Sequence, residues 1–155
     1  MKVCFKEFRD LSPDELYRIL RGRQEVFTFE QGIIYQDMDF IDQESVHAFI
    51  RNEETCDICA YLRIIRPGIK YPESSMGRLF TLSAYRRCGL GREIMEKAIS
   101  FAGDNFGFPI RIEAQEYLVD FYKSLGFKAI SAPFILEGLS HVEMILEGSQ
   151  PGEIL

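Results

Sequence analysis

A short basic segment with two glycines is the part of this sequence best suited to hold an anion. An apolar run at residues 79–82 leads toward Arg86-Arg87-Cys88-Gly89-Leu90-Gly91-Arg92, and an amphipathic segment follows. Glycines at the start of a helix let several backbone N–H groups point at one anion, because no side chain intervenes. The helix dipole and the three arginines add positive charge at the same end. The segment therefore fits a pyrophosphate, although a plain strand-to-helix turn with glycine for close packing would look similar.

Hydrophobic periodicity predicts the elements that would position this segment. The apolar run enters as a strand, and apolar residues at three- and four-residue spacing after Gly89 predict one helix that ends at Gly103. Clean alternation over residues 109–115 predicts a strand with one buried face. Residues 117–126 are expected to form a short helix that ends at Gly126.

The remaining elements complete a mixed sheet. Residues 1–7 are expected to form a strand, and Ser12-Pro13-Asp14-Glu15 is a capping box that opens a helix. Residues 46–50 and 58–65 form a predicted hairpin, and two last strands are expected near 129–136 and 141–146. Hairpins combined with strand-helix-strand crossovers indicate helices on both faces of one sheet. Ligands of such sheets bind beyond the carboxyl ends of parallel strands, here near Leu82 and Gln115.

Residues 29–42 are too irregular for one helix and too aromatic for a simple linker. Such a segment commonly forms a short helix and a loop over a cleft. A packed connector whose aromatic side chains complete the core is the alternative.

Composition limits the class of protein. The chain of 155 residues fits one domain, assigned to residues 1–147, with a loose polar tail at 148–155. A net charge of −6 argues against a nucleic-acid binder, since phosphate neutralisation needs a basic face. No apolar run approaches the roughly 20 residues of a membrane helix, and the N-terminus lacks a signal-peptide pattern. We therefore expect a soluble, cytoplasmic protein without a membrane partner.

The cysteines do not predict a metal site. Cys56 and Cys59 have metal-like spacing, but no second pair exists, and His47 and His141 are the only histidines. A zinc site needs four ligands of suitable geometry, so reduced, structural thiols are expected instead. Cys88 lies in the proposed pyrophosphate segment, and no covalent role is expected of it.

Two motifs resemble one enzyme family. Residues 86–91 resemble the Arg/Gln-x-x-Gly-x-Gly/Ala pyrophosphate loop of the GNAT acetyltransferases, and residues 121–127, Phe-Tyr-Lys-Ser-Leu-Gly-Phe, resemble a segment of their fourth helix. The resemblance extends to the ElaA-like branch and covers nearly the whole chain except the tail. The residues that carry it are Leu16-Tyr17, Arg23, Val26-Phe27, Glu30-Gln31, Tyr35-Gln36-Asp37, Asp39, Tyr61-Leu62-Arg63, Ala114-Gln115 and His141-Val142-Glu143-Met144.

The resemblance implies a mixed α/β fold whose central, largely antiparallel sheet of about six to seven strands is flanked by about four helices. It also implies that acetyl-CoA is the co-substrate and that a primary amine attacks the thioester directly in a ternary complex. Orientation of the two substrates would supply much of the acceleration, and N–H donors would stabilise the developing oxyanion. The residues implied for co-substrate binding are Phe80, Thr81 and Leu82 on the central strand, flanking Arg86 and Arg87, and the backbone of Cys88, Gly89, Leu90, Gly91 and Arg92.

Tyr122 is the candidate general acid for the departing CoA thiolate, because family members use the tyrosine of the fourth helix. A core tyrosine with a satisfied hydroxyl is the alternative. The base is less clear. Glu113 is taken as the candidate, but His141 and Glu143 on a late strand, or a water molecule, remain open, and each of these side chains could be merely structural. The residues expected to bind the acceptor are Glu30, Tyr35, Asp37, Gln115 and His141.

Other functions remain open. A non-catalytic acyl-CoA or nucleotide sensor could use the same loop, and the aromatic segment 27–40 could dock a partner protein. A nucleoside triphosphatase is disfavoured, because the loop lacks the Gly-Lys-Ser/Thr ending that holds phosphate and metal. Neither the acceptor amine nor the oligomeric state follows from the sequence, and a homodimer is possible.

Overall fold

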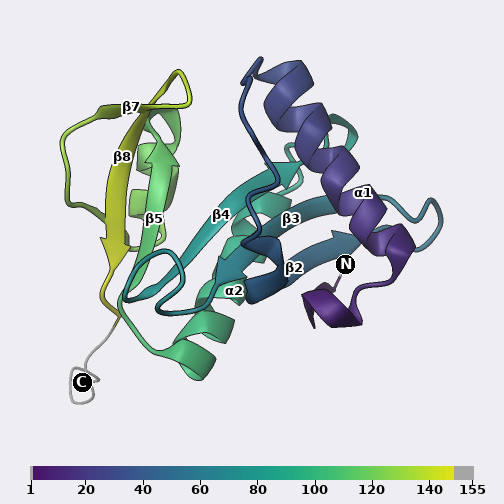
Figure 1. Cartoon of the computed structure of the whole chain (residues 1–155), viewed down its shortest axis with the longest axis horizontal. Helices are drawn as coiled ribbons and strands as arrows, with labels where there is room; N and C mark the ends of the chain where they lie inside the picture. Colours follow the sequence, from purple (N-terminus) through teal and green to yellow (C-terminus); the bar gives the residue numbers. More distant parts are fainter. Residues whose placement is uncertain (1, 149–155) are drawn as a thin grey trace.

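The fold is built on one mixed sheet of eight strands, seen in a computed structural model that describes residues 2–148 (Figure 1). The strand order is β1-β2-β3-β4-β5-β8-β6, with β7 paired to β8. Within these residues β4 and β5 run parallel, and the other pairs are antiparallel. The strands are β1 (Val3–Glu7), β2 (Ser45–Arg51), β3 (Ile58–Ile65), β4 (Ser74–Thr81), β5 (Ile110–Gln115), β6 (Lys128–Ala129), β7 (Phe134–Leu136) and β8 (Leu139–Leu146).

This sheet confirms the predicted mixed, largely antiparallel architecture, with more strands than expected. The single strand predicted near 129–136 is two short ones, β6 and β7, which both pair with β8. The chain between them contains Pro133, which has no N–H to donate to a ladder. The predicted loose tail lies outside the described residues, apart from Gly148.

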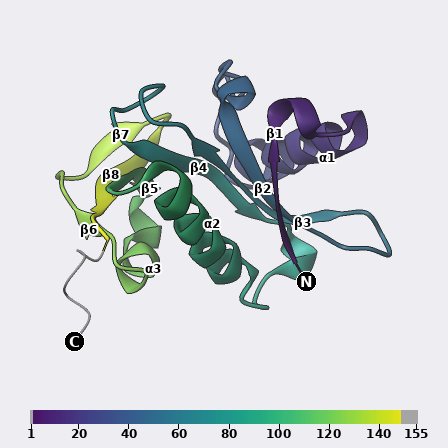
Figure 2. The same cartoon turned by 90° about the horizontal axis from the view of Figure 1, so that it is seen from below.

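Helices cover both faces of the sheet (Figure 2). Helix α1 (Pro13–Arg23), which continues as a π-helix (Gln24–Glu30), lies on one face, and α2 (Leu90–Phe106) and α3 (Val119–Ser124) lie on the other. One hydrophobic core forms between the sheet and α2 and α3, and a second forms beneath α1. The short 3₁₀ turns are Phe8–Asp10, Asp42–Glu44, Ser83–Tyr85 and Glu116–Leu118.

The start of α1 is as predicted and the end of α2 is not. The Glu15 N–H donates to Ser12 Oγ (3.0 Å), and the Ser12 N–H donates back to Glu15 Oε1 (2.8 Å), which is a complete capping box. Helix α2 continues through Gly103 and ends at Phe106, and the next residue, Gly107, takes the positive φ (+77°) that is common after a helix end. Gly103 serves packing instead, because a Cβ there would lie 2.6 Å from two ring atoms of Phe108.

Strands β4 and β5 separate partway along their length. They pair only from Ser74 and Ile110 to Met76 and Ile112, although both strands continue. Just beyond, the register between β3 and β4 shifts, and Arg78 has a positive φ (+57°), so β4 carries a bulge. A bulge bends its strand and increases the local twist. The gap that opens between two parallel strands is the feature that positions the site.

A glycine-to-alanine pair tests the packing of α1. A Cβ at Gly22 would lie 2.4 Å from the ring of Phe80, which is buried in the core beneath α1. We expect Gly22→Ala to destabilise the protein by about 1–3 kcal/mol, because overpacking outweighs alanine's better helix propensity. Gly103→Ala is the matched control: it also lies inside a helix, but it faces the half-exposed Phe108 ring, which can move. Urea unfolding measures both, and equal stabilities of the two variants would contradict the prediction.

Candidate functional site

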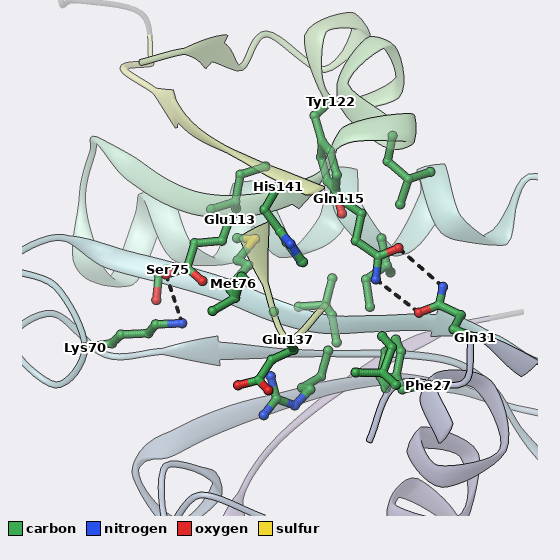
Figure 3. A pocket seen from close by; sticks show the side chains of 18 of the residues that line it. Phe27, Gln31, Lys70, Ser75, Met76, Glu113, Gln115, Tyr122, Glu137 and His141 are labelled. Atoms are coloured by element: carbon green, nitrogen blue, oxygen red, sulfur yellow. Dashed lines mark hydrogen bonds and ion pairs between the residues drawn. The ribbon is translucent and has the colours of Figure 1, made fainter. Parts of the chain in front are cut away.

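A pocket of about 160 Å³ lies where β4 and β5 separate. Its walls come from both faces of the sheet: Phe27 from the α1 side, Met76 from β4, Glu113 from β5 and Tyr122 from α3 (Figure 3). The hairpin of β7 and β8 closes one side with His141. Side chains far apart in the sequence therefore meet at the split in the sheet.

The start of α2 presents a row of free backbone donors. The first residue of this helix whose N–H makes a backbone hydrogen bond is Glu93, which donates to Gly89 O (3.0 Å). Among the described residues, none accepts a hydrogen bond from the N–H groups of residues 87–92. Arg87 and Gly89 both have positive φ (+64° and +77°), a conformation that turns successive N–H groups toward one concave side. A Cβ added at Gly91 would meet only Thr81 Oγ1, at 3.9 Å, so the space over this helix end is open.

Of the three arginines near this helix end, Arg86 and Arg92 already have partners, and Arg87 is exposed. Arg86 Nε donates to the carbonyl oxygen of Thr81 (2.9 Å), and its Nη2 pairs with Glu30 (2.7 Å). Arg92 donates to Ser124 Oγ (2.6 Å) and stacks over Phe121. A ligand amide that used Thr81 O would have to replace the Arg86 contact.

Phe80 and Leu82, also predicted to contact the co-substrate, differ in what they leave free for a ligand. The Phe80 side chain is buried in the core beneath α1, so only its main chain is near the gap. The Leu82 N–H is already bonded to Cys59 O (2.9 Å), so it is not free for a ligand. Leu90, whose N–H is free, packs its side chain into the other core.

Tyr122 is a buried tyrosine whose hydroxyl faces the pocket (Figure 3). Its ring packs edge-on against Phe121 and Phe127, which fixes its position. No hydrogen bond joins its hydroxyl to another residue between 2 and 148, so the alternative of a satisfied core hydroxyl does not hold within them. Burial, aided by nearby Tyr117, raises the pKa of Tyr122, so the hydroxyl keeps its proton at neutral pH.

Glu113 lies in the pocket wall but is not free. Its Oε1 accepts a hydrogen bond from the Tyr71 hydroxyl and pairs with Lys70 Nζ (3.2 Å). Burial and this carboxylate together raise the pKa of Tyr71. The Arg111 guanidinium lies over the Tyr71 ring, 4.9 Å from its centroid, and extends the cluster toward Glu143. Glu113 thus anchors the loop between β3 and β4 against β5.

Gln115 and His141 face each other across the β5–β8 ladder. Gln115 exchanges two hydrogen bonds with Gln31 (3.1 and 3.4 Å), which lies just after the π-helix, and this pair bridges the mouth of the pocket (Figure 3). The same Gln31 also donates to the Tyr117 hydroxyl (3.2 Å). The His141 ring is held by a hydrogen bond between Nδ1 and Leu139 O (2.8 Å).

Asp37 belongs to a buried ion cluster rather than to the pocket. Its carboxylate accepts from Arg23 Nε (3.0 Å), from Arg78 Nε (2.8 Å) and from the Tyr35 hydroxyl (2.7 Å). Burial alone would raise the pKa of Asp37, but Arg23, Tyr35 and Arg78 outweigh burial and lower it. Both carboxylate oxygens are therefore occupied, and an acceptor bound by Asp37 as predicted would have to displace one of these partners. Tyr35 does line the pocket.

Asp42 lies at the centre of the same cluster. Its Oδ1 accepts from Arg23 Nη1 (2.7 Å) and Arg63 Nη1 (3.0 Å), and both arginine side chains are fully buried. Asp39, which is more exposed than Asp42, pairs with the same Arg63: its Oδ2 lies 2.7 Å from Arg63 Nη2. Burial would raise the pKa of Asp39, but the hydrogen bonds and charge of Arg63 lower it well below its usual range. This cluster holds the segment after the π-helix against α1, β3 and β4.

Two further sequence expectations meet the structure here. Glu30 pairs with Arg86 and does not line the pocket, so it is left out of the proposed acceptor site. The pocket instead gains Lys70, Tyr71 and Ser75, and the Ser75 hydroxyl is buried with no hydrogen-bond partner between residues 2 and 148. Their only sequence signal was a polar stretch between two strands, and this does not distinguish a site from a loop.

Neither a metal cluster nor a membrane-spanning helix is found in the described part of the chain. No group of three or more His, Cys, Asp or Glu side chains within it could hold a metal ion. No helix within it is long and apolar enough to cross a membrane. Cys56 and Cys59 are free thiols.

A split mixed sheet with open N–H groups at the following helix, and a pocket at the split, defines an acyl-CoA-dependent acyltransferase. A family model described as an acetyltransferase (GNAT) domain matches residues 18–148. The chain belongs to the GNAT acetyltransferase family, in its ElaA-like branch.

Individual relatives agree with this placement. A UPF0039 protein from Synechocystis is 36% identical over 142 residues, which are 91% of this chain and 92% of that protein. The crystal structure of an acyl-CoA N-acyltransferase from Pseudomonas aeruginosa is 30% identical, with a TM-score of 0.87 over 94% of this chain and 99% of that one. The crystal structure of Escherichia coli ElaA is 27% identical, with the same TM-score and coverage.

Proposed function

We propose that the protein transfers an acetyl group from acetyl-CoA to a primary amine by direct attack in a ternary complex. The observation that carries the proposal is the row of open N–H groups at residues 87–92, next to the gap between β4 and β5. A pyrophosphate fits such a row, since the donors and the helix dipole both favour an anion. The similar protein from Pseudomonas aeruginosa is named an acyl-CoA N-acyltransferase, which supports nitrogen as the acceptor atom.

The chain's own residues define the path of the reaction. The backbone of residues 87–92 would hold the pyrophosphate, and the edge of β4 near Thr81 would receive the pantetheine arm after Arg86 moves. The arm would then enter the gap and bring the thioester to the pocket that Tyr122 lines. Holding both substrates in this pocket would replace a bimolecular encounter by an oriented attack. Tyr122, which keeps its proton, would donate it to the departing thiolate.

The acceptor would enter from the α1 side of the sheet. Tyr35, Gln31 and Gln115 line that side of the pocket, together with the Lys70–Glu113 ion pair. Because Arg78 and Lys70 are each paired with carboxylates, the wall carries little uncompensated positive charge that would repel a protonated amine. An amine therefore fits this wall better than an anionic acceptor would.

Turnover is tested directly by thiol release from acetyl-CoA in the presence of amines, amino acids and peptides, with CoA binding measured by calorimetry in parallel. Thiol release that depends on an amine, with the acetylated amine identified by mass spectrometry, supports the proposal. Tight CoA binding without acetyl transfer to any amine would favour a sensor. If the protein does not bind CoA at all, the proposed CoA site is wrong.

A matched pair of variants tests the N–H row. Gly91→Pro deletes one donor within the first turn of α2, where proline is tolerated. We expect it to weaken CoA binding about 10- to 150-fold, as the loss of one hydrogen bond to a charged group costs about 1.5–3 kcal/mol. Gly91→Ala adds a methyl group but keeps the N–H, and Thr81 Oγ1 at 3.9 Å leaves it room. Calorimetric titration with CoA compares the affinities of Gly91→Pro and Gly91→Ala. Equal affinities would mean that the N–H of residue 91 does not bind CoA.

One observation favours a second candidate function, the docking of a partner protein on segment 27–40. Phe29, Ile34 and Phe40 in this segment are 75%, 94% and 85% exposed. Such side chains on one segment are typical of an interaction surface, and a second copy of this chain is one possible partner. Light scattering of the purified protein measures association, and a monomer that turns over acetyl-CoA would argue against it.

A further inference from the structure

We infer that Nε2 of His141 is the general base that takes the proton from the attacking amine. This assignment rests on the proposed acyl transfer and names the residue for a step that the sequence left open. It goes beyond the candidate base Glu113, whose carboxylate is held by Tyr71 and Lys70.

The hydrogen bond of the other ring nitrogen decides which tautomer His141 adopts. Nδ1 lies 2.8 Å from the carbonyl oxygen of Leu139, and a carbonyl oxygen can only accept. Nδ1 therefore carries the proton in the neutral ring, which leaves the lone pair on Nε2. No described residue makes a hydrogen bond to Nε2, so this lone pair is free for a ligand.

The ring of His141 lies in the pocket in which the acceptor is proposed to bind. His141 is buried by neighbouring residues yet lines the pocket, and its imidazole extends into the pocket near Glu113 and Gln115 (Figure 3). Register places it opposite Gln115 on β5, and the Phe134 ring packs beside it at 6.2 Å. The Tyr122 hydroxyl enters the same pocket from α3. The structure thus provides an acceptor and a donor of protons in one pocket.

The other histidine provides an internal contrast. His47 is fully buried, and its Nε2 lies 2.9 Å from the carbonyl oxygen of Asp42, while Nδ1 lies 2.8 Å from the Tyr61 hydroxyl. The same reasoning puts its proton on Nε2, the opposite tautomer. Burial lowers the pKa of His47, so it stays neutral and has no access to a substrate.

The proton transfers balance for a neutral amine. The amine nitrogen forms a bond to the thioester carbonyl carbon, and the carbon–sulfur bond breaks. His141 Nε2 takes the proton that the nitrogen loses, and the Tyr122 hydroxyl gives its proton to the sulfur. Solvent then removes one proton from His141 and returns one to Tyr122, so the net products are an amide and the free thiol.

Charged groups around His141 come from every neighbouring element. Lys70 and Tyr71 face the pocket from the loop between β3 and β4, and Arg78 faces it from β4. Glu113 faces it from β5, and Glu137 lies in the turn between β7 and β8. Glu143 follows two residues later on the same face of β8. Carboxylates and cations are thus both present around the ring.

The test combines kinetics with a measurement that needs no turnover. The pH dependence of kcat is recorded at saturating acetyl-CoA and amine, because kcat reports groups in the ternary complex rather than the free amine. Wild type should lose activity with unit slope toward acid pH, because a base that is already protonated cannot accept the amine proton. His141→Asn keeps a donor for Leu139 O but has no base; it should be about 100-fold slower at neutral pH, lose this acidic limb and bind CoA as wild type does.

Each outcome has a meaning. Glu113→Gln should keep the acidic limb of the kcat–pH profile. If the acidic limb disappears in Glu113→Gln and persists in His141→Asn, Glu113 is the base. An acidic limb or wild-type kcat that persists in His141→Asn overturns the assignment. Nitrogen-15 NMR of the two histidines should show protons on Nδ1 of His141 and on Nε2 of His47. A proton on Nε2 of His141 overturns the assignment even if no acceptor is found, whereas a wild type that acetylates no amine defeats the proposed function itself.

Discussion

A Tyr122→Phe protein is expected to bind CoA as tightly as wild type does and to transfer the acetyl group at least about 100-fold more slowly. The reason is that the substitution removes a proton and an oxygen and nothing else. The ring keeps its edge-on contacts with Phe121 and Phe127, and no other described residue loses a hydrogen bond. Without a positioned acid the thiolate must leave unprotonated or wait for water.

The measurement is kcat at saturating acetyl-CoA, with CoA affinity and thermal stability as checks on folding. Tyr17→Phe is the matched control, since Tyr17 is an exposed residue of α1 far from the pocket lining, and it should leave kcat within about twofold. Wild-type turnover in Tyr122→Phe would remove the acid role and return Tyr122 to the core.

An Asp42→Asn protein is expected to lose about 3–5 kcal/mol of its free energy of unfolding. Asp42 Oδ1 accepts from two buried guanidinium groups at once, those of Arg23 and Arg63. An amide keeps the shape but not the charge, so the two buried cations would lose the anion between them and keep only Asp37 and Asp39 as counter-ions. Losing one partner of a buried ion cluster is costly because the remaining charges have been removed from water and are less well compensated.

The exposed pair of Arg18 and Asp14 provides the control. These side chains are 2.9 Å apart on the surface of α1, four residues apart in sequence. Asp14→Asn is expected to cost less than about 1 kcal/mol, because solvent screens the pair. Urea unfolding of both variants measures the difference. If Asp42→Asn loses less than about 1 kcal/mol, Asp37 and Asp39 are sufficient counter-ions for the two arginines and the prediction is wrong.

Local sequence signals predicted local structure well. The capping box at Ser12, the strand at 58–65 and the start of α2 after Gly89 all form as expected. Each depends on residues close together in the chain, so the pattern carries the information. The errors have a local cause too: Gly103 looked like a helix end, but its lack of a side chain makes room for Phe108.

The contacts of the predicted acceptor-side residues could not be read from the sequence, since they depend on distant partners. Asp37 looked like a carboxylate ready to bind an amine, but Arg23, from α1, and Arg78, from β4, occupy it. Gln115 was predicted without its partner Gln31, which lies 84 residues earlier in the chain. No periodicity or motif encodes such a contact.

By itself the sequence determined the class of fold, the family resemblance and the helix start suited to a pyrophosphate. These follow from short-range patterns of apolar residues, glycine and arginine, which act through the backbone nearby. Only the tertiary structure decided which side chains meet in the pocket. The bulge at Arg78 accompanies the separation of β4 from β5, and the β5–β8 register places His141 opposite Gln115. The free N–H row at residues 87–92 was thus predictable from adjacent residues, whereas the presence of Tyr122 and His141 in one pocket required the folded sheet to bring their elements together.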